Sequence, residues 1–413
     1  MQNLTGNNFK IDSDHRKMIV GNEPMIFHCH HYNTFLQRTI QDAAFIESNH
    51  FLVGAAAEMA FYQLTNYFQE MKIEGELCRK EIAQEIFKWT GCGVVDLDAL
   101  SIQGGKTQTQ SSHYSVAWVE KFGRSAQGVC KFMAGWIAGA LAAVYDQQLG
   151  AYSVHETTCK AKGDACDTFV LKQEKANYSI YQTVGIGQIS EHQLITPPES
   201  NVSYQAVFRA FNNMPIVSND RGLLPALGVY LTRMYANYYN RISFEFLRAL
   251  NQKIGDAGVG LASELLIEAG HVCAFNTFGG IVTSPEWDAL VLPNLKTKED
   301  WVHGITATVN VLGWGRWQIK SLSEQSAEFV IHDDYESCGY LAMYGQSDHD
   351  VSYLAMGAAA GIMNLVYIGN VSEGLDLSPT FYNQLFKSDQ SYKIKTISSK
   401  AQGDETTNIV VYR

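Results

Sequence analysis

Apolar and polar positions follow two periodic patterns along the chain. Apolar residues three and four positions apart predict amphipathic helices, whereas alternation of apolar and polar residues predicts strands. The segment from Lys131 to Tyr145 is apolar, rich in alanine, and carries Gly135 and Gly139 four residues apart. Small side chains allow a neighbouring element to approach closely, so this segment is predicted to be a tightly packed helix. Alternation predicts strands after it, at Ala151 to Thr158 and at Asp167 to Leu171.

Helices are expected before the strands in each half of the chain. The periodic segments are 31–41, 50–69 and 78–90 in the first half, and 238–252, 258–269 and 298–312 in the second half. Strands are predicted to follow Gly93 and Gly315. Each half therefore places helices first and mostly antiparallel strands afterwards, which predicts an α+β fold with helices packed on one side of a sheet.

Several segments of the first half recur in the second half in the same order. Gly91-x-Gly93 returns as Gly313-x-Gly315, VCKFMAGWIAGALAAVY as VSYLAMGAAAGIMNLVY, and YSVHETTCKAKGDAC as YKIKTISSKAQGDET. A repeat of roughly 200 residues indicates a domain duplication, because solenoid repeats are far shorter. We therefore predict a first domain over residues 1–175, a linker over 176–205 and a second domain over 206–413.

The composition is that of an ordinary globular protein. The 413 residues are 46% hydrophobic and 18% charged, which is enough for two domains with sizeable cores. The net charge of −11, without a basic cluster, argues against a nucleic-acid partner. The polar N-terminus lacks the apolar core of a signal peptide, and no run suggests a membrane span. We therefore expect no membrane partner. The eight irregularly spaced cysteines favour reduced thiols in the cytoplasm.

Potential metal ligands gather around the glycine-bearing helix. Cys130 opens that helix, Glu156 and Cys159 lie at the end of a strand, and Cys166 follows a tight turn at 162–164. Three thiols and a carboxylate supply the four ligands that tetrahedral zinc needs, and a site filled by four protein ligands is structural. The alternative is a set of ordinary buried, reduced cysteines.

The stretch from Tyr114 to Leu171 resembles the 4-vinyl reductase domain family, through VCKFMAGWIAGAL followed by ETTCKAKGDAC. This family includes small-molecule-binding modules in proteins similar to bacteriochlorophyll vinyl reductase and in the sensor regions of phenol- and xylene-responsive transcription activators. The resemblance implies a structural zinc ion held by Cys130, Glu156, Cys159 and Cys166. The loop before Glu156 is a few residues longer than in the family, so His155 is the substitute ligand to consider.

The second half keeps the sequence pattern that resembles this family but has other residues at the four positions of the metal ligands. The aligned residues there are Ser352, Thr396, Ser399 and Thr406. Hydroxyl side chains of this kind do not form a zinc site. We therefore predict two tandem 4-vinyl-reductase-like units, with metal in the first unit only. A duplicated domain inherits the contact of a homodimeric ancestor, so the two halves are expected to pack against each other. A homodimer of the whole chain is also compatible with the sequence.

A second group of potential ligands is Phe27-His28-Cys29-His30-His31-Tyr32-Asn33. Three histidines and a cysteine are soft and borderline metal ligands, suited to iron or copper. Adjacent side chains cannot all face one ion, but His28 and His31 are three residues apart and could share a helical face. The alternative is that these side chains bind no metal and form only local hydrogen bonds at the start of a helix. The aligned second-half residues are Tyr235, Ala236, Asn237 and Tyr238, so any special chemistry is expected in the first half.

The resemblance implies a pocket for a small hydrophobic, aromatic or tetrapyrrole-like molecule. We place this pocket in the first half, near His28, His30, His31, Tyr32, His113 and Trp118. For Trp118 the alternative is plain core packing. The primary interpretation is thus a cytoplasmic small-molecule-binding protein with a structural zinc ion.

Two other functions stay open at the level of sequence. One is a metal- or haem-dependent enzyme or biosynthetic accessory protein that uses iron, copper or haem at His28 to His31. No nucleotide loop, nucleophile elbow or zinc-protease helix occurs in the sequence, so no catalytic residue can be assigned. The other is a structural scaffold, similar to related subunits of vesicle-tethering complexes.

Overall fold

The computed structural model describes residues 10–12, 17–178 and 194–413. Residues 1–9 and 13–16 of the polar N-terminal segment and residues 179–193 of the predicted linker lie outside the described residues. Three antiparallel sheets are seen in the described part of the chain. The first has five strands in the order β1 (Lys10–Asp12), β2 (Lys17–Val20), β3 (Glu23–Cys29), β9 (Val229–Tyr235) and β8 (Leu224–Ala226).

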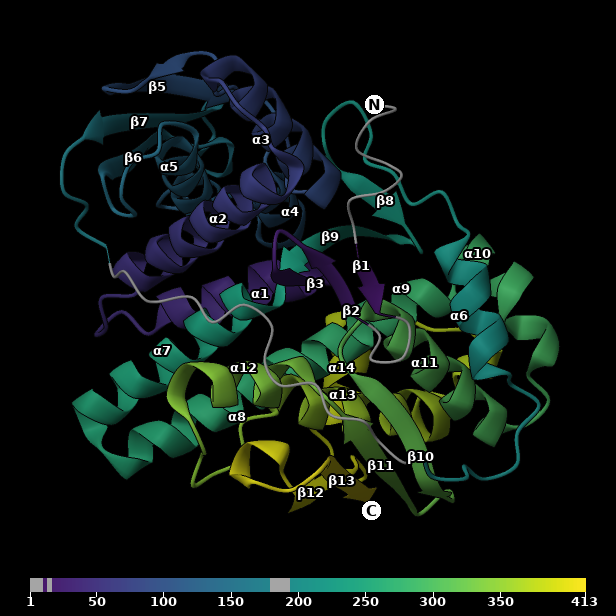
Figure 1. The fold of residues 1–413 in the computed structure, drawn as a ribbon. Helices are drawn as coiled ribbons and strands as arrows, with labels where there is room; N and C mark the ends of the chain where they lie inside the picture. The colour runs from purple at the N-terminus through teal and green to yellow at the C-terminus, as the bar shows by residue number, and fades with distance from the viewer. Residues whose placement is uncertain (1–9, 13–16, 179–193) are drawn as a thin grey trace.

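Each of the other two sheets belongs to one half of the chain. The first-half sheet has the order β4 (Leu100–Ser101), β5 (Gly104–Thr109), β7 (Asp167–Gln173) and β6 (Tyr152–Thr158). The second-half sheet has the order β10 (Arg316–Leu322), β11 (Ser326–His332), β13 (Thr407–Tyr412) and β12 (Lys393–Ser398). These sheets and the helices beside them confirm the predicted α+β class (Figure 1).

The helices of the first half precede and separate its strands. They are α1 (His30–Asp42), α2 (Asn49–Met71), α3 (Glu76–Thr90), α4 (His113–Phe122), α5 (Lys131–Val144) and the short 3₁₀ helix η1 (Lys160–Lys162). The segments of the second half that occupy the same places in the order are α7 (Ala236–Ile254), α8 (Asp256–Cys273), α11 (Lys298–Leu312), α12 (Tyr335–Tyr344), α13 (Tyr353–Met363) and η6 (Lys400–Gln402). The shared order is compatible with two repeated units.

The second half also has helical segments without a counterpart in the first half. They are α6 (Tyr204–Asn212), the π-helix η2 (Ala274–Phe278), α9 (Gly279–Val282), α10 (Pro285–Leu290), η3 (Leu292–Asn294), the π-helix η4 (Asn364–Ile368), η5 (Val371–Glu373) and α14 (Pro379–Phe386). The α14 segment lies between α13 and β12, where the first half has no helix, and its Phe386 packs against Phe275 of η2. This extra helix therefore covers the end of the α8–η2 helix.

The recurring glycine pairs follow a helix in both halves, with Gly91 after α3 and Gly313 after α11. Gly91 and Gly93 have φ angles of 82° and 121°, and Gly313 and Gly315 have φ angles of 87° and 122°. Positive φ angles are strained for residues with a Cβ atom, so the same turn requires glycine at all four positions.

Close helix packing at Gly135 and Gly139 is confirmed. A Cβ atom on Gly135 would lie 2.1 Å from the Val53 carbonyl oxygen, and one on Gly139 would lie 2.1 Å from the Ala57 carbonyl oxygen. Both contacts advance in the same direction along the chain, so α2 and α5 run parallel. In the second half, Gly357 of α13 approaches α8 in the same way.

The two halves share the five-stranded sheet and one continuous hydrophobic core. Strand β3 pairs with β9, with Met25 opposite Tyr235 and Cys29 opposite Leu231. Helix α1 packs against α8, and α2 packs against α7. In Figure 1, β3 and β9 lie between the first-half elements around α2 and α5 and the second-half elements around α8 and α13. The two halves therefore pack on each other, as predicted. The contact is made by the β2–β3 and β8–β9 hairpins and by the helices that follow them.

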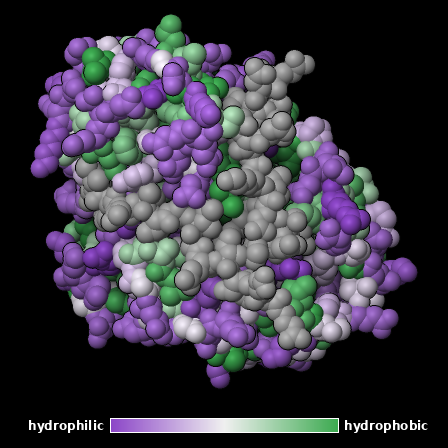
Figure 2. Space-filling view, viewed as in Figure 1, coloured by the Kyte–Doolittle hydropathy of each residue, from purple (hydrophilic) through white to green (hydrophobic). Residues whose placement is uncertain are grey.

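One stretch differs from the sequence expectation about membrane spans. Asp256–Val282 is long and apolar enough, by length and composition alone, to cross a membrane. Within the structure, 72% of its most apolar window is buried, and α8 packs against α13 and α1. A core helix has the same properties. Elsewhere the exposed large apolar residues, such as Leu77 and Val217, are scattered, and Figure 2 shows a mainly hydrophilic visible face.

Candidate functional site

Four potential metal ligands converge in the first half. Cys130, Glu156, Cys159 and Asp167 each offer one ligand atom, and these atoms lie within 4.8 Å of one another. Cys130 immediately precedes α5, Glu156 lies on β6, Cys159 follows β6, and Asp167 opens β7. The first three were predicted from the sequence, so the helix start and the β6–β7 hairpin meet as expected.

The fourth position of this cluster is taken by Asp167, whereas the sequence predicted Cys166. Successive side chains on a strand point to opposite faces. Asp167 is fully buried on the same face of β7 as Phe169, whereas Cys166 is half-buried with its Sγ 3.6 Å from Thr168 Oγ1. The alternative ligand, His155, is exposed. The sequence already contained the signal, because the predicted strand began at Asp167.

Hydrogen bonds fix the orientation of both carboxylates. Asp167 Oδ2 accepts from Ser115 Oγ at 2.7 Å, and Asp167 Oδ1 accepts from the Lys160 backbone N–H at 2.7 Å. Glu156 accepts from the Cys130 backbone N–H at 3.2 Å. Such outer contacts orient metal ligands and restrict their rotamers. The sequence reasoning missed Ser115 because it lies on α4, far from the ligands along the chain.

The cluster concentrates acidic groups away from water. Burial raises the pKa of the Cys130 thiol, and the neighbouring Cys159, Glu156 and Asp167 raise it further. Burial also raises the pKa of Glu156, opposed in part by Lys131, whose Nζ lies 4.0 Å from Glu156 Oε2. A divalent cation would favour the ionised forms of all four groups. Two thiols and two carboxylates are a donor set that fits zinc in a tetrahedral site.

Hydroxyl groups and one carboxylate occupy the corresponding place in the second half. Asp334 accepts hydrogen bonds from Ser352 Oγ at 2.9 Å, Thr407 Oγ1 at 2.7 Å and the Ser337 backbone N–H at 2.8 Å. Thr407 holds the position of the first-half Asp167, one residue after the predicted Thr406. Among the described residues, the first-half cluster is the one group of three or more close His, Cys, Asp or Glu ligands.

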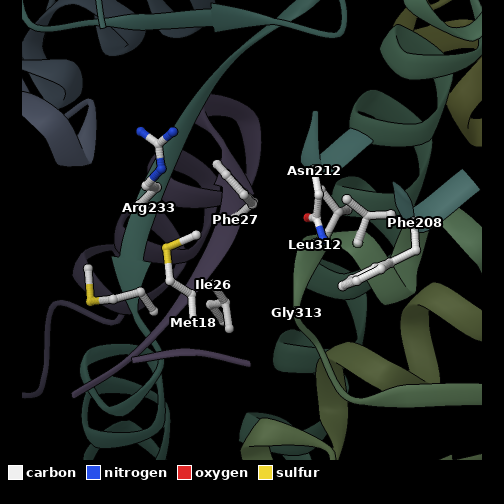
Figure 3. A pocket seen from close by; sticks show the side chains of 10 residues that line it. Met18, Ile26, Phe27, Phe208, Asn212, Arg233, Leu312 and Gly313 are labelled. Atoms are coloured by element: carbon white, nitrogen blue, oxygen red, sulfur yellow. The ribbon is translucent and has the colours of Figure 1, made fainter. Parts of the chain in front are cut away.

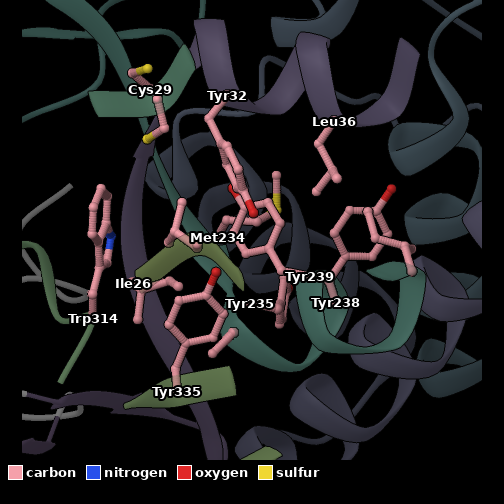
Figure 4. Packing of buried hydrophobic residues seen from close by; sticks show 14 of the residues in the cluster. Ile26, Cys29, Tyr32, Leu36, Met234, Tyr235, Tyr238, Tyr239, Trp314 and Tyr335 are labelled. Carbon is pink, nitrogen blue, oxygen red and sulfur yellow. The ribbon is translucent and has the colours of Figure 1, made fainter. Parts of the chain in front are cut away.

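His28 does not join a metal-ligating group with its neighbours. Its ring lies between those of Tyr32, at a centroid distance of 4.3 Å, and Trp314, at 4.7 Å, and both pairs are stacked. Burial lowers the pKa of His28 well below its ordinary value, so the ring is neutral. Figure 4 shows Tyr32, Trp314 and Tyr335 pointing into the same apolar region. The predicted first-half residues His28 and Tyr32 thus pack among second-half aromatic residues.

His113 and Trp118 are packed inside the first half. His113 Nε2 lies 3.0 Å from Asn33 Nδ2, and burial lowers the pKa of His113 to about 3, so its nitrogen accepts this hydrogen bond. Asn33 Oδ1 in turn accepts from the Tyr239 hydroxyl. Trp118 is 7% exposed and packs edge-on against Phe122. Neither residue lines any of the three cavities described below, and for Trp118 core packing is the better interpretation.

His30 and His31 lie together at the start of α1. Their ring centroids are 3.8 Å apart, and burial lowers the pKa of both rings, with His30 at about 4. His30 Nδ1 accepts a hydrogen bond from the Tyr230 backbone N–H at 3.2 Å. A neutral imidazole that accepts at Nδ1 carries its proton on Nε2. His30 therefore keeps one hydrogen-bond donor, which the backbone contact fixes at Nε2.

The His30 side chain lines a cavity of about 320 Å³ that is open to solvent and lies where the two halves meet. The walls come from the β8–β9 hairpin, the start of α10 and the end of α4. They consist of Pro225, Ala226, Leu227, Gly228, Val229, Tyr230, Pro285, Glu286 and Glu120. The surface is mainly apolar, with His30 as a donor and two glutamates as acceptors. This combination of apolar walls and few polar groups is typical of small-molecule sites.

Two other cavities are less suited to an apolar ligand. A cavity of about 390 Å³ lies beside the metal-ligand cluster and is lined by many polar groups, among them His50, Lys131 and Glu156. A cavity of about 40 Å³ separates Met18 and Phe27 from Phe208, as Figure 3 shows. That volume admits a few water molecules at most.

The chain is similar to several solved structures. No protein-family model matches the chain, and no curated protein sequence matches it. The crystal structure of the phenol-responsive sensory domain of the transcription activator PoxR with phenol is similar at a TM-score of 0.37 and 11% sequence identity. The match covers 50% of this chain and 88% of that chain. The predicted resemblance to the 4-vinyl reductase family is matched by no family model.

Proposed function

We propose that this protein binds a small, largely apolar molecule bearing a hydroxyl group, in the cavity lined by His30. A zinc ion on Cys130, Glu156, Cys159 and Asp167 would stabilise the first half. The observation that carries the proposal is the fixed tautomer of His30, whose Nδ1 is already used by the Tyr230 backbone N–H. Its Nε2–H is then the donor left for a ligand in an otherwise mainly apolar cavity.

The chemistry of the cavity selects the class of ligand. A hydroxyl oxygen can accept from His30 Nε2–H, and its own proton can be donated to the Glu120 or Glu286 carboxylate. The walls at Leu227 and Val229 favour an aliphatic or aromatic body, because burial of apolar surface contributes about 25 cal/mol per Å². A free carboxylate would meet two glutamates of like charge, so acids are expected to bind poorly.

The zinc ion would have a structural role. Four protein ligands complete a tetrahedral coordination shell and leave no open position for a substrate. The ion would join the start of α5 to the β6–β7 hairpin, and α5 packs along α2 in the core. Because such sites form only in the folded state, metal binding contributes directly to stability.

Calorimetric titration of the full-length, zinc-loaded protein tests the ligand assignment. The probes are para-cresol and para-xylene, which differ in one hydroxyl group and have similar size. We expect binding of para-cresol and much weaker binding of para-xylene. The His30→Leu variant should bind para-cresol about tenfold less tightly, the loss expected for one hydrogen bond of roughly 1.4 kcal/mol.

The matched control is His50→Leu, a histidine that lines the polar cavity beside the metal ligands. It should bind para-cresol like the unmodified protein. Equal affinity of the His30→Leu variant and the unmodified protein, or a loss confined to His50→Leu, would contradict the assignment of this cavity.

A further inference from the structure

Two buried thiols from different halves lie at one hydroxyl group. Cys29 ends β3 and Cys273 ends α8, and both side chains are fully buried. Cys29 Sγ lies 2.7 Å from Thr277 Oγ1, and Cys273 Sγ lies 3.4 Å from the same oxygen. Thr277 belongs to the π-helix that directly follows α8. Single π-helical turns often mark functional positions, because they shift side chains off the regular helical path.

We propose that Cys29 and Cys273 form a redox-active pair, which hydrogen peroxide oxidises to a disulfide that joins the two halves of the chain. The pair is held in place by the packing of α1 against α8 and by the pairing of β3 with β9. Rotation of the two side chains away from Thr277 would bring the sulfur atoms together. A small oxidant is required, since both thiols are shielded from solvent.

The two thiols differ in their surroundings, which assigns their roles. Burial opposes ionisation of Cys29, but hydrogen bonds with Cys273 and Thr277, together with the charge of Lys121, lower its pKa. Burial and the neighbouring Cys29 raise the pKa of Cys273. Thr277 Oγ1 lies closer to Cys29 Sγ, at 2.7 Å, than to Cys273 Sγ, at 3.4 Å, so we assign Cys29 as the nucleophilic thiolate and Cys273 as the resolving thiol. His28 Nδ1 lies 3.9 Å from Cys273 Sγ and can accept its S–H hydrogen bond.

The reaction balances with hydrogen peroxide as the only oxidant. The Cys29 thiolate attacks one peroxide oxygen, the O–O bond breaks, and the departing hydroxide takes up a proton as water. This step leaves a sulfenic acid on Cys29. The Cys273 sulfur then attacks the Cys29 sulfur, and the hydroxyl group leaves as a second water with the Cys273 proton. Two thiols and one peroxide thus give one disulfide and two waters.

Other cysteines provide internal comparisons. Cys92 is buried with its pKa raised to about 12 and should stay reduced. Cys78 is exposed on the surface and reports on general oxidation. Cys130 and Cys159 are close to each other in the metal-ligand cluster, so the experiment uses zinc-loaded protein and locates each link by its peptides.

The test treats full-length protein with hydrogen peroxide, then denatures it, alkylates it without reductant and maps its peptides by mass spectrometry. We expect a peptide pair joined through Cys29 and Cys273, lighter by two hydrogen atoms and absent after reduction. Cys29→Ser and Cys273→Ser should each lose this species. Thr277→Val should form it more slowly, because the hydrogen bond that lowers the Cys29 pKa is lost.

Thr283→Val is the matched control, since Thr283 Oγ1 donates only to carbonyl groups of its own helical segment. It should form the linked peptide at the rate of the unmodified protein. Absence of the Cys29–Cys273 peptide under conditions that oxidise Cys78, in protein whose circular dichroism is unchanged, would overturn the proposal. A rate of link formation that falls equally in Thr277→Val and Thr283→Val would do the same.

Discussion

Trp314, in the second half, donates its indole N–H to the backbone oxygen of Phe27 in the first half, at 2.8 Å. The opposite half makes a similar contact, because Trp136 Nε1 donates to the Tyr235 hydroxyl at 2.9 Å. In each case a hairpin from one half reaches a buried tryptophan of the other half. Buried hydrogen bonds therefore join the two halves in both directions, and we expect the halves to unfold together although each has its own sheet.

Trp314→Phe and Trp136→Phe test this cooperativity. Each variant leaves a buried acceptor without its donor, at a cost of about 1–3 kcal/mol. We expect each to lower the midpoint of a single unfolding transition, measured by circular dichroism during urea denaturation. Two separate transitions, with only one of them shifted by each variant, would show that the halves unfold independently.

Gly135→Ala tests the close contact of α2 and α5. The new Cβ atom would lie 2.1 Å from the Val53 carbonyl oxygen, which belongs to the backbone and cannot move alone. Overpacking of this kind should destabilise the protein by about 1–3 kcal/mol in urea denaturation.

Gly260→Ala on α8 is the control, because no atom lies within 4 Å of the position that its Cβ atom would take. It should be neutral or stabilising by up to about 1 kcal/mol, as alanine favours helices. Equal effects of the two substitutions would contradict the packing described for α2 and α5.

Glu336 should make stability depend on pH. This carboxyl group is buried beside the start of α13, and burial raises its pKa to about 8 in the folded protein. The folded state then holds a proton that the unfolded state releases above its ordinary pKa of about 4.5. The stabilising contribution is complete at low pH and is lost as pH rises toward about 8.

Glu336→Gln should remove this part of the pH dependence. We expect the difference in unfolding free energy between the variant and the unmodified protein to change between pH 5 and about 8, and to level off above. Urea denaturation across this range measures that difference. A constant difference would mean that Glu336 titrates normally in the folded state.

Local patterns were sufficient to predict the α+β class and the close packing at Gly135. Cys130, Glu156 and Cys159 were predicted as ligands through the family resemblance, because their spacing alone also fits ordinary buried cysteines. Strand alternation alone could have predicted that Asp167, and not Cys166, points toward the cluster, since Asp167 shares a face with Phe169. The environment of His28 could not have been predicted in this way, because it depends on Trp314, which is distant in sequence and approaches only through the pairing of β3 with β9. Period and spacing report on one element at a time, whereas such contacts depend on how elements assemble.

The fourth ligand of the proposed metal site in the first half is the point on which the account depends most. Asp167 is fully buried and oriented by Ser115, whereas Cys166 lies outside the cluster. Asp167→Asn keeps the shape of the side chain and removes the negative charge that a zinc ion requires. Cys166→Ser changes the neighbouring thiol and serves as its matched control.

The most direct measurement is the zinc content of the purified full-length variants, determined by elemental analysis after dialysis against a weak chelator. The account predicts one zinc ion per chain in the unmodified protein and in Cys166→Ser, and a clear loss of zinc in Asp167→Asn. Retention of zinc in Asp167→Asn together with its loss in Cys166→Ser would contradict the account.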